Sequence, residues 1–178
     1  MSADSTPEPP PSTAANSAAG RPAATPPLAR ALGRVPSGLF IVATTLQDRP
    51  IGFVASFVQQ VGFAPPTVMV AIGQDRDHLR GVRASGRFTV SVLGEADRAL
   101  MKPFFKAPPT GTAFDLVETA ATERGGLVLS GALAWLDCKL SGEHAVGDHV
   151  VIFGHVEDGS CAKDGEPLVH VRKNGLGY

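Results

Sequence analysis

Cysteine, tryptophan and tyrosine are scarce in this sequence of 178 residues, which has two cysteines, one tryptophan, one tyrosine and a formal net charge of −1. Cys138 and Cys161 lie far apart and form no C-x-x-C pair, so neither a disulfide framework nor a zinc site of standard spacing is indicated. The near-neutral charge, with no basic cluster, excludes the surface typical of nucleic-acid binding. No apolar run approaches the roughly 20 residues of a membrane-spanning helix. We therefore predict a cytoplasmic protein with reduced thiols that binds neither nucleic acids nor membranes.

Standard catalytic motifs are also missing. The sequence has no G-x-G-x-x-G, no Walker phosphate loop, no G-x-S-x-G turn and no H-E-x-x-H zinc motif. His149 and His155 share one face of a predicted strand, but Val151 and Phe153 make that face partly apolar and no third ligand accompanies them. We therefore predict no metal site.

Composition divides the chain into two parts. Residues 1–27 are rich in proline, alanine, serine and threonine and have scarcely any large apolar side chain, so we predict a disordered tail. This tail lacks the features of a secretory signal or a mitochondrial transit peptide. With 43% hydrophobic and 19% charged residues overall, the sequence is long enough for one globular domain, which we expect at residues 28–178.

Apolar periodicity predicts mostly strands. Helices are expected at 28–35, at 75–86 and at 95–105, where Pro103 should break the last one. Strands are expected at 38–45, 51–66, 67–72, 87–93, 132–142, 148–159 and 167–171, with turns at 46–50 and 143–147. Alternation from 132 to 142 sets Asp137 and Cys138 on opposite faces of a half-buried strand. Hairpin connections favour a mainly β (α+β) fold, a small antiparallel, Greek-key-like barrel with a few short helices.

Residues 52–66 have the sequence GFVASFVQQVGFAPP, and ASGRFTVSVL, GALAWLDCKL and GDHVVIFGHVEDG follow later in the chain. In this order the phrases resemble the flavin reductase-like family, the FMN-binding split β-barrels. Residues 52–66 are similar to the family phrase G-M-T-(A/V)-(S/N)-S-F-x-S-V-S-x-x-P-P, with identities at Gly52, Ala55, Ser56, Val61, Pro65 and Pro66. ASGRFTVSVL, GALAWLDCKL and GDHVVIFGHVEDG resemble three further family strands. LGRVPSGLFIVATT, LMKPFFK and HVRKNGLGY are especially similar to the C-terminal reductase module of photosynthetic flavodiiron proteins. The resemblance covers residues 28–178.

This resemblance implies that the stretch IGFVASFVQQVGFAPP, from Ile51 to Pro66, lines a flavin ring. Small residues would let the ring approach the backbone, and serine and glutamine side chains could bond its polar edge. The ring-site residues expected on this basis are Phe53, Val54, Ala55, Ser56, Gln59 and Gln60. The alternative is an ordinary bent strand with a bulge and solvent-facing glutamines.

The flavin phosphate is expected in the loop GQDRDHLR and at the start of the helix that follows, where free N–H groups favour an anion. The candidate donors are Gln74, Arg76, His78 and Arg80. Asp75 and Asp77 depart from the family pattern and would repel a phosphate unless Arg76 or Arg80 pairs with them. The alternative is a charged helix cap.

By resemblance, a nicotinamide pocket on the second side of the flavin is expected to include Asp148, His149, His170 and Tyr178, with Arg172 nearby. His149 is the positioning residue expected for hydride transfer; the alternative is a histidine that caps a hairpin through Asp148. No side-chain nucleophile is required, because the cofactor carries the reaction.

The resemblance implies a homodimeric NAD(P)H:flavin oxidoreductase, with NADH or NADPH as the donor, FMN as the flavin and FAD possible. A flavoredoxin-like electron carrier, reduced by a redox partner protein, is the alternative. A third hypothesis is a split barrel that binds haem or a pyridoxal-type phosphate instead.

Overall fold

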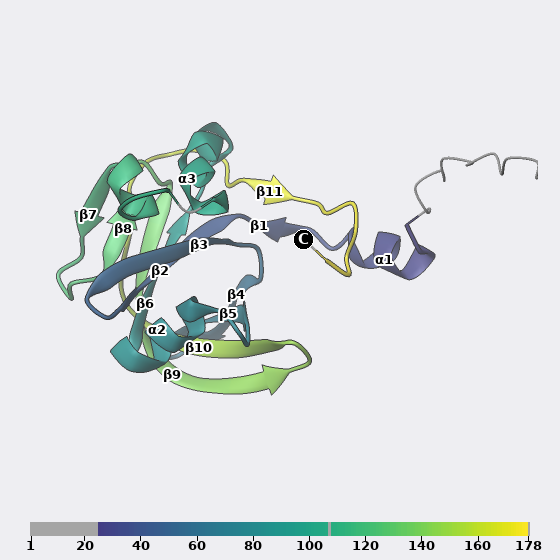
Figure 1. Ribbon diagram of the computed structural model, residues 1–178, viewed down its shortest axis with the longest axis horizontal. Helices are drawn as coiled ribbons and strands as arrows, with labels where there is room; N and C mark the ends of the chain where they lie inside the picture. Colours follow the sequence, from purple (N-terminus) through teal and green to yellow (C-terminus); the bar gives the residue numbers. More distant parts are fainter. Residues whose placement is uncertain (1–24, 107, 178) are drawn as a thin grey trace, which may run out of the picture.

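A seven-stranded antiparallel sheet forms the body of the protein in the computed structural model, which describes residues 25–106 and 108–177 (Figure 1). The strands are β2 Phe40–Leu46, β3 Arg49–Ala55, β4 Val58–Phe63, β5 Pro66–Gly73, β6 Arg87–Val92, β9 Ala134–Val146 and β10 His149–Cys161. Their order is β3-β2-β6-β9-β10-β5-β4, and every neighbouring pair is antiparallel. The edge strands β3 and β4 follow each other in the chain without pairing, which leaves the barrel split between them. The predicted mainly β split barrel is confirmed.

Short elements close the two ends of this sheet. The helices are α1 Pro27–Leu32, α2 Asp77–Ser85 and α3 Lys102–Phe105, with 3₁₀ helices η1 Glu95–Met101 and η2 Ala113–Leu116. Two small sheets pair β1 Ser37–Gly38 with β11 Val169–His170, and β7 Thr119–Ala121 with β8 Leu127–Leu129. In the described part of the chain, no helix is long and apolar enough to span a membrane.

Residues 51–66 form two strands rather than the single strand expected. β3 ends at Ala55 and pairs with β2, whereas β4 begins at Val58 and pairs with β5. The chain changes partner strand between them, at Ser56 and Phe57, because β3 and β4 lie at opposite edges of the sheet. The apolar run could not reveal this break, because it continues through Ser56 and Phe57 with no proline or turn signal between the two strands.

Two other boundaries were predicted wrongly. The segment 95–105 is a 3₁₀ helix followed by α3, and Pro103 lies in the first turn of α3 instead of breaking a helix; proline is tolerated in a first turn because that N–H has no helical partner. Residues 143–146 belong to β9 and pair with β10, so the expected turn at 143–147 shrinks to Gly147 and Asp148.

Apolar side chains pack in two clusters, one inside the barrel and one under the short helices. The barrel cluster contains Val42, Ala55, Val68, Val70, Ile72, Leu79, Val82, Phe88, Val90, Cys138, Val150 and Ile152. The second cluster contains Leu39, Ile41, Ala43, Leu93, Met101, Phe114, Leu129, Ala132 and Leu168. Burial raises the pKa of the Cys138 thiol to about 12, so this cysteine is a packing residue and not a thiolate at neutral pH.

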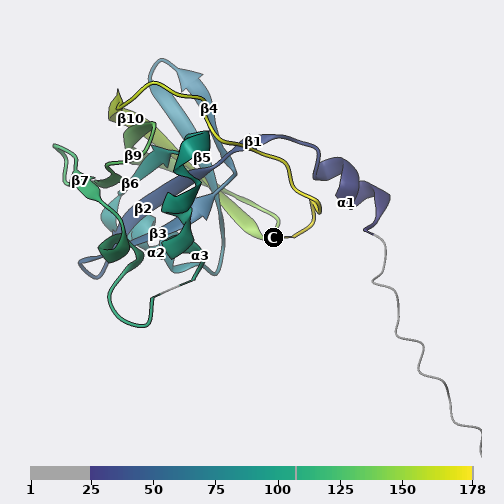
Figure 2. The ribbon, with the colours of Figure 1, turned by 90° about the horizontal axis from the view of Figure 1, so that it is seen from above.

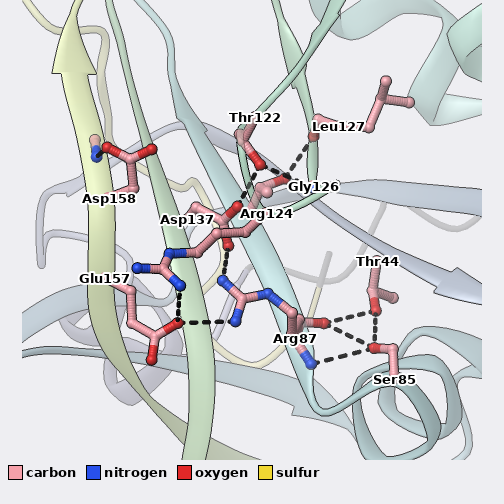
Figure 3. A network of polar contacts seen from close by, with 12 residues as sticks. Thr44, Ser85, Arg87, Thr122, Arg124, Gly126, Leu127, Asp137, Glu157 and Asp158 are labelled. Atoms are coloured by element: carbon pink, nitrogen blue, oxygen red, sulfur yellow. Dashed lines mark hydrogen bonds and ion pairs between the residues drawn. The ribbon is translucent and has the colours of Figure 1, made fainter.

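A buried carboxylate lies at the centre of a polar network on β9 (Figure 3). The side chain of Asp137 is fully buried; it accepts a hydrogen bond of 2.6 Å from Arg87 on β6 and a short one from Thr122, next to β7. Arg87 also donates to Glu157 on β10 at 2.9 Å. The network therefore ties the β7–β8 hairpin to three strands of the main sheet.

The two ends of the described chain lie side by side, away from the barrel (Figures 1 and 2). The backbone N–H of Gly175 donates to the carbonyl of Ala29 in α1 at 2.8 Å. The expected helix at 28–35 is present but shorter, since it ends at Leu32. The tail predicted at 1–27 lies largely outside the described residues, and its last residue, Pro27, begins α1.

Candidate functional site

A cavity of about 690 Å³ opens where the end of β3 meets the ends of β5 and β10. We call it the site pocket. Its lining residues are Leu39, Phe53, Val54, Ala55, Ser56, Ala71, Ile72, Gly73, Gln74, Asp75, Arg76, His78, Phe104, Phe105, Asp148, His149, His170 and Arg172. The volume falls within the roughly 300–1,000 Å³ that is usual for sites of small molecules and cofactors.

Most of the residues predicted for a flavin and nicotinamide site line this one cavity. They are Phe53, Val54, Ala55, Ser56, Gln74, Arg76, His78, Asp148, His149 and His170. Segments more than a hundred residues apart in the sequence thus meet as the resemblance implies. Tyr178 lies outside the described residues.

Three predicted residues lie outside the site pocket. Gln59 and Gln60 line a second cavity of about 320 Å³, because the chain has left β3 and joined β5 before it reaches them. Arg80 is exposed and forms an ion pair with Asp77 one helical turn away. The structure therefore does not bring these side chains to the ring or phosphate positions expected for them.

Small side chains on β3 and β5 open the floor of the site pocket. Ala55 and Ser56 contribute at the end of β3, and Ala71 and Gly73 contribute from β5. Gly52 has a different role from the expected one, because a Cβ there would lie 2.7 Å from the ring of Phe114. Its missing side chain makes room for packed phenylalanines rather than for a ligand.

The N-terminus of α2 faces the site pocket at the loop that was predicted to hold phosphate. No side chain caps this nine-residue helix, so its first N–H groups remain available to an anion. Arg76, at the N-cap position, lines the site pocket and adds a positive charge. The condition set for Asp77 is met, since Arg80 pairs with it. It is not met for Asp75, which lines the site pocket and forms no ion pair among the described residues, so its charge opposes a phosphate there. This end of the site pocket suits a phosphate group.

His78 lines the site pocket and is held by two contacts. Its Nε2 donates to the carbonyl oxygen of Gly52 at 3.2 Å, and its ring packs against Phe53 with centroids 4.6 Å apart. Burial lowers the pKa of His78, the Gly52 carbonyl partly offsets this, and the charge of Arg76 lowers it further. In the neutral ring Nδ1 has no proton to donate, so His78 is poorly suited to the phosphate contact predicted for it.

His149 begins β10 on the opposite wall. Its Nδ1 donates to the Asp148 carboxylate at 2.7 Å, and its ring meets the edge of Phe57 at a centroid distance of 5.8 Å. The hydrogen bond to His149 lowers the pKa of Asp148. With Nδ1 used in this way, Nε2 of a neutral ring accepts hydrogen bonds. Hairpin capping and a role toward a ligand are thus compatible for this histidine.

Sequence reasoning assigned no role to several other lining residues. Phe104 and Phe105 come from α3, where Phe104 packs edge-on against Phe114 at 5.1 Å and Phe105 stays 69% exposed at the rim. The sequence pattern predicted only strands at Leu39, Ala71 and Ile72 and gave no sign that they line a cavity. The family resemblance of the LMKPFFK phrase was the available signal for Phe104 and Phe105. Such a resemblance does not show that these side chains line the site pocket, or on which side.

The features of the site pocket suit a flavin nucleotide. The floor of small side chains admits a planar ring, and the uncapped α2 N-terminus with Arg76 suits a phosphate at one end. A polar wall with Asp148 and His149 lies opposite. These features are those of an apolar cleft with a few convergent polar groups.

Residues 32–175 match the protein family described as flavin reductase like domain. Diflavin flavoprotein A 1 of Synechocystis sp. is 34% identical over 154 residues, which are 85% of this chain and 27% of that protein. The flavin-dependent monooxygenase reductase subunit HsaB of Mycobacterium tuberculosis is 31% identical over 126 residues, which are 71% of this chain and 66% of that protein.

Among solved structures, the NADH:FAD oxidoreductase SgcE6 of Streptomyces globisporus superposes with a TM-score of 0.75 at 28% identity, covering 81% of this chain and 86% of that one. The chain spans 27% of the length of its Synechocystis diflavin relative. The family match nevertheless covers most of this chain and the whole site pocket. The chain therefore belongs to the flavin reductase like family, and its split barrel is the family fold.

Proposed function

We propose that the protein is a flavin-dependent oxidoreductase in which NADH or NADPH transfers a hydride to a flavin in the site pocket. FMN is the flavin proposed, and FAD is the alternative. The observation that carries the proposal is the shape and polarity of the site pocket, where small side chains on β3 lie beside the uncapped N-terminus of α2. The printed names of HsaB and SgcE6 support flavin reduction as the activity.

When bound, the flavin supplies the hydride-accepting chemistry. The residues of this chain bind the flavin and the nicotinamide donor and orient them toward each other. Arg76 and the α2 N–H groups hold the phosphate, and the segment from Phe53 to Ser56 supports the ring. His149, fixed through Nδ1 by Asp148, presents Nε2 to the carboxamide N–H of the nicotinamide. Phe105 at the rim helps to exclude water.

Anaerobic stopped-flow mixing of the flavin-loaded protein with NADH, and separately with NADPH, tests this function. We expect one or both nucleotides to bleach the flavin absorbance near 450 nm, a general property of oxidised flavins, within a single turnover. The control is free FMN at the same concentration without protein. Flavin that binds and stays oxidised with both nucleotides would refute hydride transfer from a nicotinamide.

The second candidate function is an electron carrier reduced by a redox partner protein. The feature that favours it is the similarity to a diflavin flavoprotein, of which this chain corresponds to 27%, because such a segment can receive electrons from another flavoprotein unit. Tight flavin binding without bleaching in the same experiment would favour this function. The family match argues against haem or a pyridoxal-type phosphate as the ligand.

We also propose a homodimer that works in the cytoplasm. Val61 and Phe63 on the edge strand β4 are 49% and 89% exposed, and apolar side chains on an unpaired strand edge favour association. Cys138 and Cys161 are both free, which suits a reducing compartment that also holds NADH and NADPH.

Replacing His149 with alanine is expected to slow hydride transfer about tenfold and to leave the flavin dissociation constant within twofold, because the lost contact is to the nicotinamide. Single-turnover bleaching and flavin titration measure the two effects. His144, an exposed histidine on the neighbouring strand, provides the matched control as His144→Ala. Equal losses of rate and flavin affinity in His149→Ala would instead assign His149 a structural role.

A further inference from the structure

Arg172 reaches the site pocket from the C-terminal segment and lies over an aromatic ring. Its guanidinium carbon is 4.7 Å from the centre of the Phe57 ring, and the same ring meets His149 edge-on. Arg172 is half-buried and lines the site pocket. A cation is thus positioned beside the residue proposed to contact the nicotinamide.

The backbone of Arg172 is held in place by the other end of the chain. A Cβ on Gly33 would lie 2.5 Å from the carbonyl oxygen of Arg172, so the two segments are in close contact. The bond from Gly175 to Ala29 fixes the chain three residues further on. α1 and Gly33 therefore pack against the C-terminal segment that carries Arg172.

Arg172 differs from Arg80 and Arg83 of α2 in having no anionic partner among the described residues. Arg80 pairs with Asp77, and Arg83 forms two hydrogen bonds with Glu143. Within residues 25–106 and 108–177, no carboxylate or carbonyl oxygen accepts a hydrogen bond from the Arg172 side chain. Stacking on Phe57 uses the face of the guanidinium and leaves its N–H edge available. A planar, half-desolvated set of N–H donors suits a phosphate oxygen better than it suits water.

We propose that Arg172 binds a phosphate group of a nucleotide in the site pocket, as a second anion contact separate from Arg76 and the α2 N-terminus. The ligand class is a nucleotide phosphate or diphosphate. Two nucleotides could supply it: the nicotinamide donor, through its diphosphate, or the flavin. The inference rests on the proposed function, because that function brings two phosphate-bearing ligands into one cavity.

Ligand pairs with and without phosphate test the proposal. The flavin arm compares the dissociation constants of FMN and riboflavin by flavin fluorescence. The donor arm compares the KM of NADH with that of 1-benzyl-1,4-dihydronicotinamide, which has no phosphate. The variants are Arg172→Met, which keeps the side-chain length without charge, and Arg172→Lys, which keeps the charge without the planar fork. Lys173→Met is the control, because Lys173 is exposed and does not line the site pocket.

In Arg172→Met we expect the preference for the phosphate-bearing ligand to fall on the order of tenfold in one arm, as for the loss of a charged hydrogen bond. Arg172→Lys should restore part of it, and Lys173→Met should change neither ratio. A fall in the flavin arm identifies the flavin phosphate, and a fall in the donor arm identifies the donor diphosphate. The proposal would be overturned if Arg172→Met changed neither the preference for FMN over riboflavin nor the preference for NADH over 1-benzyl-1,4-dihydronicotinamide. It would also be overturned if Lys173→Met lowered either preference as much as Arg172→Met does.

The same measurements separate this proposal from the proposed function. If the wild-type protein binds FMN but oxidises neither donor, hydride transfer fails; the flavin arm, with the dissociation constants of the two donors in place of their KM values, then still decides the role of Arg172. If the wild-type protein is active and Arg172→Met keeps both ratios, only the role of Arg172 fails. Binding of neither ligand by the wild-type protein would refute both.

Discussion

Replacing Asp137 with alanine is expected to lower the free energy of unfolding by about 3 kcal/mol, the lower end of the range for breaking a buried ion pair. The Asp137 side chain is fully buried and bonds both Arg87 and Thr122. Its removal leaves the Thr122 hydroxyl proton and part of the Arg87 guanidinium without an acceptor in the protein interior, although the Thr122 oxygen still accepts from the N–H of Gly126. The loss of unfolding free energy should stay near the lower end of the range for buried ion pairs, because Arg87 is 28% exposed and keeps its contact with Glu157.

Urea denaturation followed by tryptophan fluorescence measures this change, since the single tryptophan, Trp135, lies on the same strand as Asp137. Asp158→Ala is the matched control, because Asp158 on β10 is only half-buried and, among the described residues, its side chain bonds only the N–H of the next residue, Gly159. We expect the control to lose less than about 1 kcal/mol, because it loses one local hydrogen bond and no ion pair. A loss below about 1 kcal/mol in Asp137→Ala would show that the network does not stabilise the β7–β8 hairpin.

The sequence could not place Asp137 in the interior. Period-2 alternation correctly separates it from Cys138, yet both side chains are fully buried, because the two faces of β9 are covered by different elements. The barrel cluster covers one face, and the β7–β8 hairpin covers the other. Residues 119–129 form that hairpin but have no pattern strong enough to predict strands. A half-buried strand was therefore the best available prediction, and a non-local contact overrode it.

The site was predictable where its residues are local in sequence and missed where distant segments meet. The run from Phe53 to Ser56 and the start of α2 each belong to one continuous element, so a phrase and a helix-start signal were enough. The phenylalanines of α3 reach the site pocket only through the packing of Phe104 on Phe114. Gln59 and Gln60 of β4 lie outside the site pocket, because β4 pairs with β5 and not with the partner strand of β3. The pattern of apolar residues does not indicate which strands pair with each other.

Replacing Ser56 with tryptophan is expected to weaken flavin binding at least about 100-fold, about 3 kcal/mol, and to leave the fold intact. Ser56 is half-buried at the end of β3 and lines the site pocket, where its neighbours Ala55 and Ala71 are also small. An indole at this position would occupy the space above the floor that the ring needs. The fold should tolerate it because the added volume enters an open cavity rather than a packed core.

Flavin fluorescence titration measures the affinity, and circular dichroism with thermal melting checks the fold. The matched control is Thr67→Trp, which puts the same bulk at a half-buried hydroxyl residue on β5 that lines the second cavity instead. We expect this control to bind flavin within about twofold of the wild-type protein, because the second cavity shares no lining residue with the site pocket. Loss of binding in Thr67→Trp with normal binding in Ser56→Trp would move the flavin to the cavity beside Gln59 and Gln60. That outcome would support the role in flavin binding first predicted for Gln59 and Gln60. It would also refute the proposed phosphate contact at the α2 N-terminus, because that contact belongs to the site pocket.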